Sequence, residues 1–141
     1  MYTIDGLKIP RFYYVLFSDN SGISQMFSLS ERLLNRDNME KEFSGLFFDI
    51  KNNNGFSGRF NGLINKDNVY FEKIYGGFEY LGKFIYQGNF INNHYEGNYN
   101  SVKKLCKGEF FLEEDSKLLE FAFNKLLEKS NSDQFSLELL N

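Results

Sequence analysis

The side chains that could carry chemistry are few and lie far apart along the chain. His94, the only histidine, sits in an Asn-Asn-His-Tyr stretch typical of a turn. No acid–base partner or pocket can be assigned to it from sequence, so we interpret it as a solvated turn residue. Cys106, the only cysteine, takes the place of an inward-facing aromatic residue in a repeated unit described below. We therefore expect it to be a small buried filler and not a nucleophile.

The densest carboxylate cluster is Glu113, Glu114 and Asp115. Consecutive residues of an extended segment point to opposite faces, so these three do not converge on a metal ion. Their position is explained by a following helix, with Asp115 as its cap. The chain contains no phosphate-binding loop, zinc-binding His-Glu-x-x-His or nucleophile elbow. We predict a non-enzymatic protein and assign no catalytic residue, no metal and no cofactor, with an enzyme kept open as an alternative.

Lys73 is the most informative charged residue. It lies in the β-rich segment 69–75, where Val69, Phe71, Lys73 and Tyr75 occupy alternate positions. If these three face inward, Lys73 faces inward too and needs a carboxylate or a ligand anion as its partner. If the faces are reversed, Glu72 has the same problem. The candidate ligand-binding residues are Lys73, Tyr75, Tyr86, Tyr95 and Tyr99.

A repeated five-residue unit, aromatic–x–Gly–x–aromatic, must position these residues. In a strand, positions i, i+2 and i+4 share a face, so each unit lays two large side chains over a central glycine. Glycine inside a strand indicates a bend, a bulge or a neighbouring ring that lies across the gap. Several such strands in succession favour a sheet that curls into a small barrel. The six copies are Phe43–Phe47, Phe56–Phe60, Tyr80–Phe84, Tyr86–Phe90, Tyr95–Tyr99 and Cys106–Phe110, the last beginning with cysteine.

The segments between the units contain asparagine and glycine, which favour tight hairpin turns. We predict a mainly β fold: a strongly curled antiparallel sheet, a small barrel of about eight strands, forming one domain over residues 1–141. The flanks differ, with a short helix near 30–42 capped by Ser30 and an amphipathic helix over 116–129. The expected strands include 11–17, 23–29, one long bent strand over 78–91, and a possible closing strand at 135–139.

Net charge and the length of the apolar stretches limit the classes of partner that the protein could bind. The 141 residues carry 16 Lys and Arg against 19 Asp and Glu, a net charge of −3. This excludes a basic protein that coats polyphosphate, and most lysines fall on the face opposite the rings, so a nucleic-acid partner is not expected. The longest apolar stretch, residues 12–17, has six residues, whereas a membrane-spanning helix needs about 20. We predict a soluble cytoplasmic protein with no membrane partner. The 17 Phe and 9 Tyr reflect either a packed aromatic core or an AT-rich genome.

Two family resemblances follow from the repeated unit. Tyr-x-Gly-x-Phe resembles the heart of the MORN repeat, but the glycines at 45, 58, 82, 88, 97 and 108 are spaced too irregularly to stack as a solenoid. The order Phe71-x-Lys73-x-Tyr75, Tyr86-x-Gly88-x-Phe90, Tyr95-x-Gly97-x-Tyr99 and Gly108-x-Phe110 resembles a group of small uncharacterised bacterial domains. In that group Ile and Trp are usual where Tyr95 and Tyr99 stand here. The resemblance implies a compact antiparallel barrel of lipocalin- or avidin-like shape and carries no activity with it.

Two functions stay open. In the first, the barrel holds a small, partly apolar molecule, with Lys73 or Tyr75 fixing its polar end. In the second, the interior is solid and the chain is a protein-interaction module, such as an accessory, immunity or phage-type inhibitor protein. Hairpin tips and exposed aromatic residues would then make the contacts. Pairing of free strand edges would allow a homo-oligomer in either case.

Overall fold

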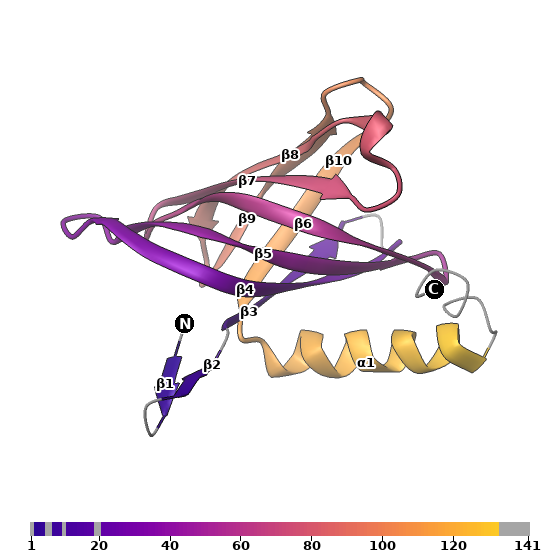
Figure 1. Ribbon diagram of the computed structural model, residues 1–141, viewed down its shortest axis with the longest axis horizontal. Helices are drawn as coiled ribbons and strands as arrows, with labels where there is room; N and C mark the ends of the chain where they lie inside the picture. The colour runs from indigo at the N-terminus through magenta and orange to yellow at the C-terminus, as the bar shows by residue number, and fades with distance from the viewer. Residues whose placement is uncertain (1, 5–6, 10, 19–20, 133–141) are drawn as a thin grey trace.

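The computed structural model describes residues 2–4, 7–9, 11–18 and 21–132. Its centre is a closed barrel with the strand order β10-β3-β4-β5-β6-β7-β8-β9 (Figure 1). All neighbours pair antiparallel, and β10 closes the barrel by pairing with both β9 and β3. The barrel strands are β3 (Arg11–Phe17), β4 (Gly22–Asn35), β5 (Glu40–Lys51), β6 (Asn54–Ile64), β7 (Asn68–Tyr75), β8 (Phe84–Ile91), β9 (His94–Ser101) and β10 (Lys107–Glu114). A separate two-stranded sheet holds β1 (Tyr2–Ile4) and β2 (Leu7–Ile9).

The predicted mainly β barrel of about eight strands is confirmed. Every strand from β3 to β10 has two neighbours, so no whole strand lies at an edge, although residues 29–35 of β4 pair with β5 and not with β3. We call the end with the β5–β6, β7–β8 and β9–β10 connections the η1 end, after the short helix η1 (Glu79–Leu81) in it. The end with the β4–β5, β6–β7 and β8–β9 hairpins is the opposite end.

The predicted helix near 30–42 is wrong. These residues form the second half of β4, a turn, and the start of β5, which pair as a long hairpin. The local pattern that suggested a helix cap at Ser30 is overridden because Ser30 is paired with Ser44 of β5, and a register shift between Ser28 and Ser30 bends the strand there. Leu33 and Leu34 are 47% and 43% exposed. They therefore do not form the buried face that a helix would need.

The predicted long strand over 78–91 is also wrong. The chain leaves β7, forms η1, and enters β8 only at Phe84. Gly82 has a φ of 77°, a left-handed conformation that ends any continuous strand at this point. As a result Tyr80 is 68% exposed and does not share the inward face of Tyr86.

The barrel interior is filled by aromatic side chains that lie over glycines of neighbouring strands. A Cβ atom added to Gly108 would lie 2.7 Å from the ring of Tyr99, and one added to Gly58 would lie 2.9 Å from the ring of Phe47. The expected ring across the gap is thus present at both positions. Residues of all eight strands form this core cluster: Tyr13, Val15, Phe17, Met26, Phe43, Phe47, Phe60, Ile64, Val69, Phe71, Phe84, Tyr86, Tyr95, Tyr99, Phe110 and Leu112.

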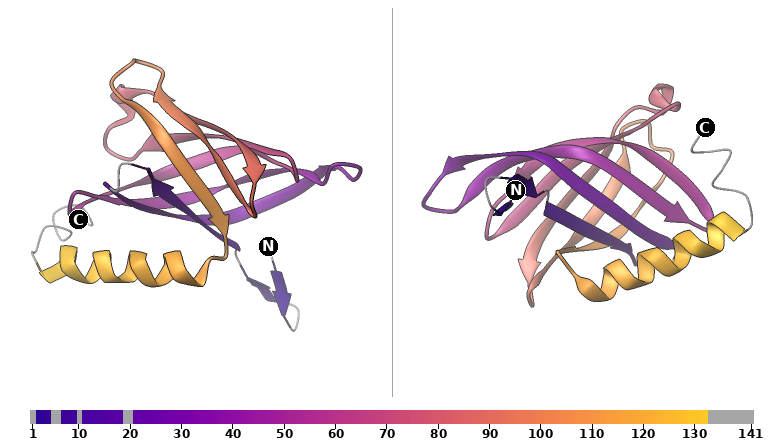
Figure 2. Two further views of the ribbon diagram at one scale, coloured as in Figure 1. Left: turned by 180° about the vertical axis from the view of Figure 1, so that it is seen from behind. Right: turned by 60° about the horizontal axis from the view of Figure 1, so that its bottom comes forward.

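A second core lies outside the barrel, under helix α1 (Lys117–Ser132). The helix runs along the outer wall of β3, β4 and β5 (Figure 2). Its Leu119 and Phe123 pack against Tyr14, Ile23 and Ile50. The predicted helix over 116–129 is confirmed as an element.

The helix cap is a different residue from the one predicted. The Ser116 hydroxyl accepts a hydrogen bond from the Leu119 N–H at 3.2 Å, so Ser116 caps the helix and Asp115 does not. Asp115 instead accepts a hydrogen bond from the Phe12 N–H, which ties the end of β10 to the start of β3. The predicted strand at 135–139 lies outside the described residues. Among the described helices, none has the length and apolar character needed to cross a membrane.

Candidate functional site

An ion pair lies inside the barrel near its η1 end. Lys73 on β7 points inward, as one of the two alternatives predicted, and its Nζ lies 2.9 Å from Oδ1 of Asp49 on β5. The same Nζ donates to the Ser24 hydroxyl on β4 at 2.9 Å. All three side chains are 0% exposed. The partner that the inward lysine requires is therefore a carboxylate of this chain.

Tyr75 and Tyr86 complete the surroundings of the ion pair. The Tyr75 hydroxyl donates to Oδ2 of Asp49 at 2.5 Å, so both carboxylate oxygens have a partner. The Lys73 Nζ lies 4.9 Å from the ring centroid of Tyr86 and 4.6 Å from that of Phe47, a cation–π arrangement. Burial lowers the pKa of Lys73, and the charge of Asp49 opposes this shift. Burial also raises the pKa of the Tyr75 and Tyr86 hydroxyls, so both stay protonated at neutral pH.

Tyr99 and Lys51 lie between the ion pair and the η1 end. The Tyr99 ring stacks on Tyr86 with centroids 5.1 Å apart. Lys51 donates to the Tyr99 hydroxyl at 3.4 Å, and its Nζ lies 4.4 Å from the Phe17 centroid. The structure thus brings together four of the five predicted ligand-binding residues: Lys73, Tyr75, Tyr86 and Tyr99.

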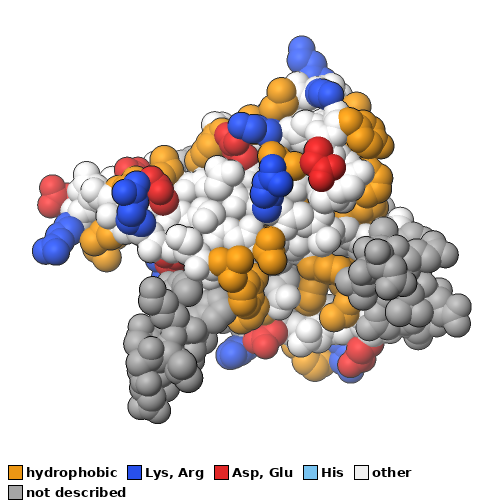
Figure 3. All heavy atoms as spheres, viewed as in Figure 1, with side chains coloured by type: hydrophobic (Ala, Val, Ile, Leu, Met, Phe, Trp, Pro, Cys, Tyr) orange, Lys and Arg blue, Asp and Glu red, His pale blue; other side chains and the backbone are white. Residues whose placement is uncertain are grey.

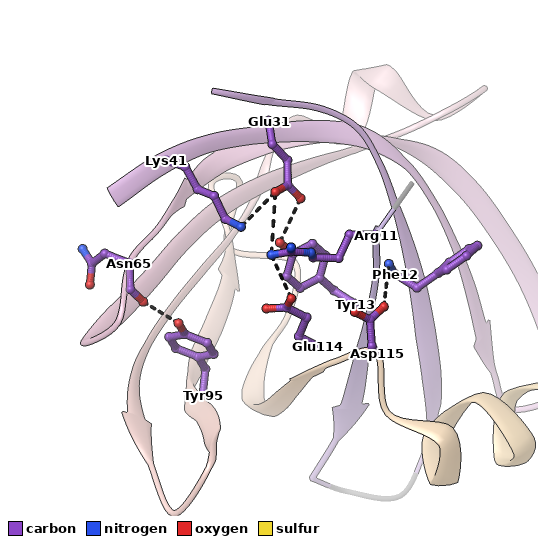
Figure 4. Close-up of polar contacts among 9 residues, drawn as sticks. All are labelled: Arg11, Phe12, Tyr13, Glu31, Lys41, Asn65, Tyr95, Glu114 and Asp115. Carbon is purple, nitrogen blue, oxygen red and sulfur yellow. Dashed lines mark hydrogen bonds and ion pairs between the residues drawn. The ribbon is translucent and has the colours of Figure 1, made fainter. Parts of the chain in front are cut away.

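Tyr95, the fifth predicted residue, lies at the opposite end of the barrel. Its hydroxyl donates to the Asn65 carbonyl oxygen (Figure 4). Burial raises its pKa to about 12. With Lys41, Ile64 and Glu114 it lines a small hollow of about 180 Å³. Tyr95 therefore cannot act on the same molecule as Lys73.

A polar network surrounds Glu31 at this opposite end (Figure 4). Glu31 accepts from Lys41 at 2.9 Å and from the Tyr13 hydroxyl at 3.0 Å, and Arg11 lies between Glu31 and Glu114, 2.8 Å from the latter. Burial raises the pKa of Glu31, but the hydrogen bond and charge of Lys41 outweigh it, and the pKa falls to about 2. Burial raises the pKa of Glu114, against the charge of Arg11. The network joins β3, β4, β5 and β10 and holds this end closed.

The remaining candidate residues from the sequence, His94 and Cys106, lie outside the buried ion-pair cluster. His94 begins β9 and contacts the neighbouring Glu96, with Nε2 and Oε2 3.1 Å apart. Cys106 is exposed, so its predicted buried position is wrong: it precedes β10 and belongs to the hairpin, not to the inward face. Within the part of the chain that the structure describes, no three His, Cys, Asp or Glu side chains gather closely enough to hold a metal ion.

Sequence reasoning missed a groove on the outer wall of β4 to β7. It has a volume of about 530 Å³ and is lined by apolar side chains that include Phe27, Leu46, Phe48 and Ile74. Leu46 is 53% exposed. The signal was present in the unbroken Leu46-Phe47-Phe48 run: because successive strand residues point to opposite faces, an inward Phe47 places both Leu46 and Phe48 on the outer face. Hydrophobic side chains are visible over the β4–β5 wall in Figure 3.

No protein-family model, no curated protein and no solved structure matches this chain. The resemblance to small uncharacterised bacterial barrels accordingly stays a prediction.

Proposed function

We propose that this protein is a non-enzymatic binding module that contacts a protein partner through its outer surface. One observation carries the proposal: the barrel interior is occupied by its own side chains, while an apolar groove lies on the outside. Lys73, Phe71, Tyr86 and Phe110 are each at most 1% exposed. Interiors packed in this way leave ligand contacts to the surface.

The contacts of the interior polar groups point in the same direction. A ligand fixed by Lys73 or Tyr75 would have to displace Asp49, which accepts from both at 2.9 Å and 2.5 Å. Displacement would leave a buried carboxylate without its cation, which costs several kcal/mol. The small-ligand hypothesis, with Lys73, Tyr75, Tyr86 and Tyr99 as its site, thus receives no support from these contacts.

The groove has the character of a partner-binding surface. Apolar side chains make up most of its lining, and the charged side chains of Arg59 and Glu79 line it as well. An apolar centre with a polar border is the usual anatomy of a protein interface. A reducing compartment such as the cytoplasm suits the proposal, because the thiol of Cys106 is exposed and the sequence has no second cysteine.

The test uses two matched variants. Leu46→Asp places a charge in the groove, and Ile91→Asp does the same at another exposed apolar position, 43% exposed and at the opposite end. The protein is used as bait in extract of its own source, and each captured protein is purified and titrated directly against bait. We expect one partner whose direct affinity falls at least tenfold for Leu46→Asp and is unchanged for Ile91→Asp. Equal binding of both variants, or a small molecule found with the purified protein by native mass spectrometry, would overturn the proposal.

A further inference from the structure

Two connections at the η1 end are joined into a single surface. The Val102 N–H donates to the Lys83 carbonyl oxygen at 2.9 Å, and the Lys103 ammonium donates to the Tyr80 carbonyl oxygen. The Lys103 side chain also runs over Gly82, 3.6 Å from where a Cβ would be. We call residues 79–83 and 102–107 together the basic tip. They lie side by side at one corner of the molecule (Figures 1 and 2).

The basic tip combines positive charge with exposed apolar side chains. Tyr80, Val102 and Leu105 are 68%, 55% and 57% exposed. All charged side chains of the tip are described: four lysines against the single carboxylate of Glu79, although the whole chain has a net charge of −3. The four lysines are Lys83, Lys103, Lys104 and Lys107. Figure 3 shows lysine and hydrophobic side chains next to each other at this corner.

In the part of the chain that the structure describes, most of this charge has no ionic partner. Glu72 pairs with Lys83 at 2.9 Å. Glu79 accepts from the Gly77 N–H of its own connection at 3.1 Å. Lys103 is held by a neutral carbonyl oxygen, which leaves its charge in place. Lysines concentrated at one end of an acidic protein attract anions to that end and speed their association.

The basic tip adjoins the groove of the proposed function. Glu79 lines that groove together with Gly76 and also belongs to the tip, and Tyr80 follows it directly in the chain. A bound segment that leaves the groove at β7 therefore meets the lysines of the tip. We propose that the basic tip binds an acidic segment of the protein partner, one in which apolar residues that fill the groove are followed by Asp or Glu residues. This inference rests on the proposed function for the groove.

The mixture of groups favours an acidic protein segment over a polyphosphate chain. The three exposed apolar side chains of the tip can be buried against apolar side chains of a peptide, whereas a charged phosphate backbone offers them no apolar contact. Within the tip, Tyr80 is the only ring that could stack on a base. All four cations are lysines, which lack the planar fork that binds phosphate in a bidentate manner.

The test measures fluorescence anisotropy of labelled probes with the full chain. The probes are a 12-residue peptide of six Leu and Phe residues followed by six Glu, and its twin with Lys in place of Glu. A 12-nucleotide single strand and vesicles containing phosphatidylserine are the competing anions. The tip variant is Lys103→Glu with Lys104→Glu, and its control is Lys66→Glu with Lys125→Glu, exposed lysines outside the tip. Both double variants change the net charge equally.

We expect the acidic peptide to bind at least ten times more tightly than its lysine twin. The tip variant should lose about tenfold or more of this affinity and most of its salt dependence, and the control should lose less than threefold. Tighter binding of the oligonucleotide or the vesicles, no binding of the acidic peptide, or equal loss in both variants would overturn the proposal.

The Leu46→Asp variant separates this inference from the function on which it rests. Equal binding of both peptides that disappears in Leu46→Asp would retain the groove and refute the basic tip. Binding of the acidic peptide alone that survives in Leu46→Asp would retain the tip and refute the groove.

Discussion

Replacing Lys73 by Met tests whether the buried ion pair holds the barrel together. The substitution keeps most of the side-chain volume and removes the charge, which leaves the Asp49 carboxylate buried with only the Tyr75 hydroxyl as a donor in the cluster. At 2.9 Å two unit charges attract each other by about 6 kcal/mol at an effective dielectric constant of 20. Desolvation of both groups offsets much of this attraction in the intact protein.

The loss of one partner and the loss of both should therefore differ greatly. We expect Lys73→Met alone to lower the free energy of unfolding by about 3–5 kcal/mol, because an uncompensated charge stays inside. The double variant, Lys73→Met with Asp49→Leu, should recover most of this loss, since an apolar pair of similar volume needs no solvation. Its remaining deficit is about 1 kcal/mol for the lost Tyr75 hydrogen bond.

Urea denaturation at pH 7, followed by circular dichroism and fluorescence of tyrosine, gives these free energies for the native protein, the single variants Lys73→Met and Asp49→Leu, and the double variant. If Lys73→Met does not fold, recovery of a cooperative transition in the double variant carries the same information. A loss below 1 kcal/mol in the single variant, or a double variant no more stable than it, would refute the reasoning.

Three further predictions concern the opposite end, the repeated glycines and the helix. The pKa of Glu31 is about 2 in the folded protein against an ordinary 4.5. The ionised Glu31 therefore contributes fully to the free energy of unfolding above pH 4.5, and this contribution is lost as the pH falls toward 2. Urea melts at pH 4.5, 3.5 and 2.5 should show about 2 kcal/mol more loss for the native protein than for Glu31→Gln. A Cβ atom at Gly45 would lie 1.9 Å from a carbonyl oxygen of the neighbouring strand, so Gly45→Ala should lower the melting temperature by about 10 °C. In the control Gly76→Ala the nearest atom is 3.4 Å from the new Cβ, and the melting temperature should stay within about 2 °C. Similar shifts for the two variants would contradict the close approach of the strands at Gly45. Phe123→Ala should cost about 3–5 kcal/mol, and Phe121→Ala, whose ring is 62% exposed, should cost less than about 0.5; equal losses in urea melts would mean that the helix docks differently.

The period of the repeated unit made the inward face predictable. Two large residues around a glycine identify Phe43 and Phe47 as inward without knowledge of their neighbours, and alternation in the segment 69–75 leaves two alternatives, of which the inward Lys73 is the one observed. All three side chains are buried. The spacing of residues within single strands was therefore enough to predict the barrel class and to offer the inward Lys73 as one of two alternatives.

The partner of Lys73 could not be found in this way. Asp49 stands between Phe48 and Ile50, where alternation is lost because this part of β5 is covered on both faces, by the barrel interior and by α1. The error near Ser30 has a related cause, since its strand conformation depends on pairing with Ser44 and not on its sequence neighbours. Information of this kind lies in contacts between distant residues, which single-sequence patterns do not contain.

The pairing of β3 with β10 has a consequence for synthesis of the chain. Phe17 and Phe110 are register partners, 93 residues apart. At about 5–20 residues per second, a ribosome needs roughly 5–20 s to make the intervening chain. During that interval one edge of β3 is unpaired, and an unpaired edge can pair with a strand of another chain and start aggregation. The newly made chain thus passes through a stage in which the barrel is open between β3 and β9, until synthesis of β10 allows it to close.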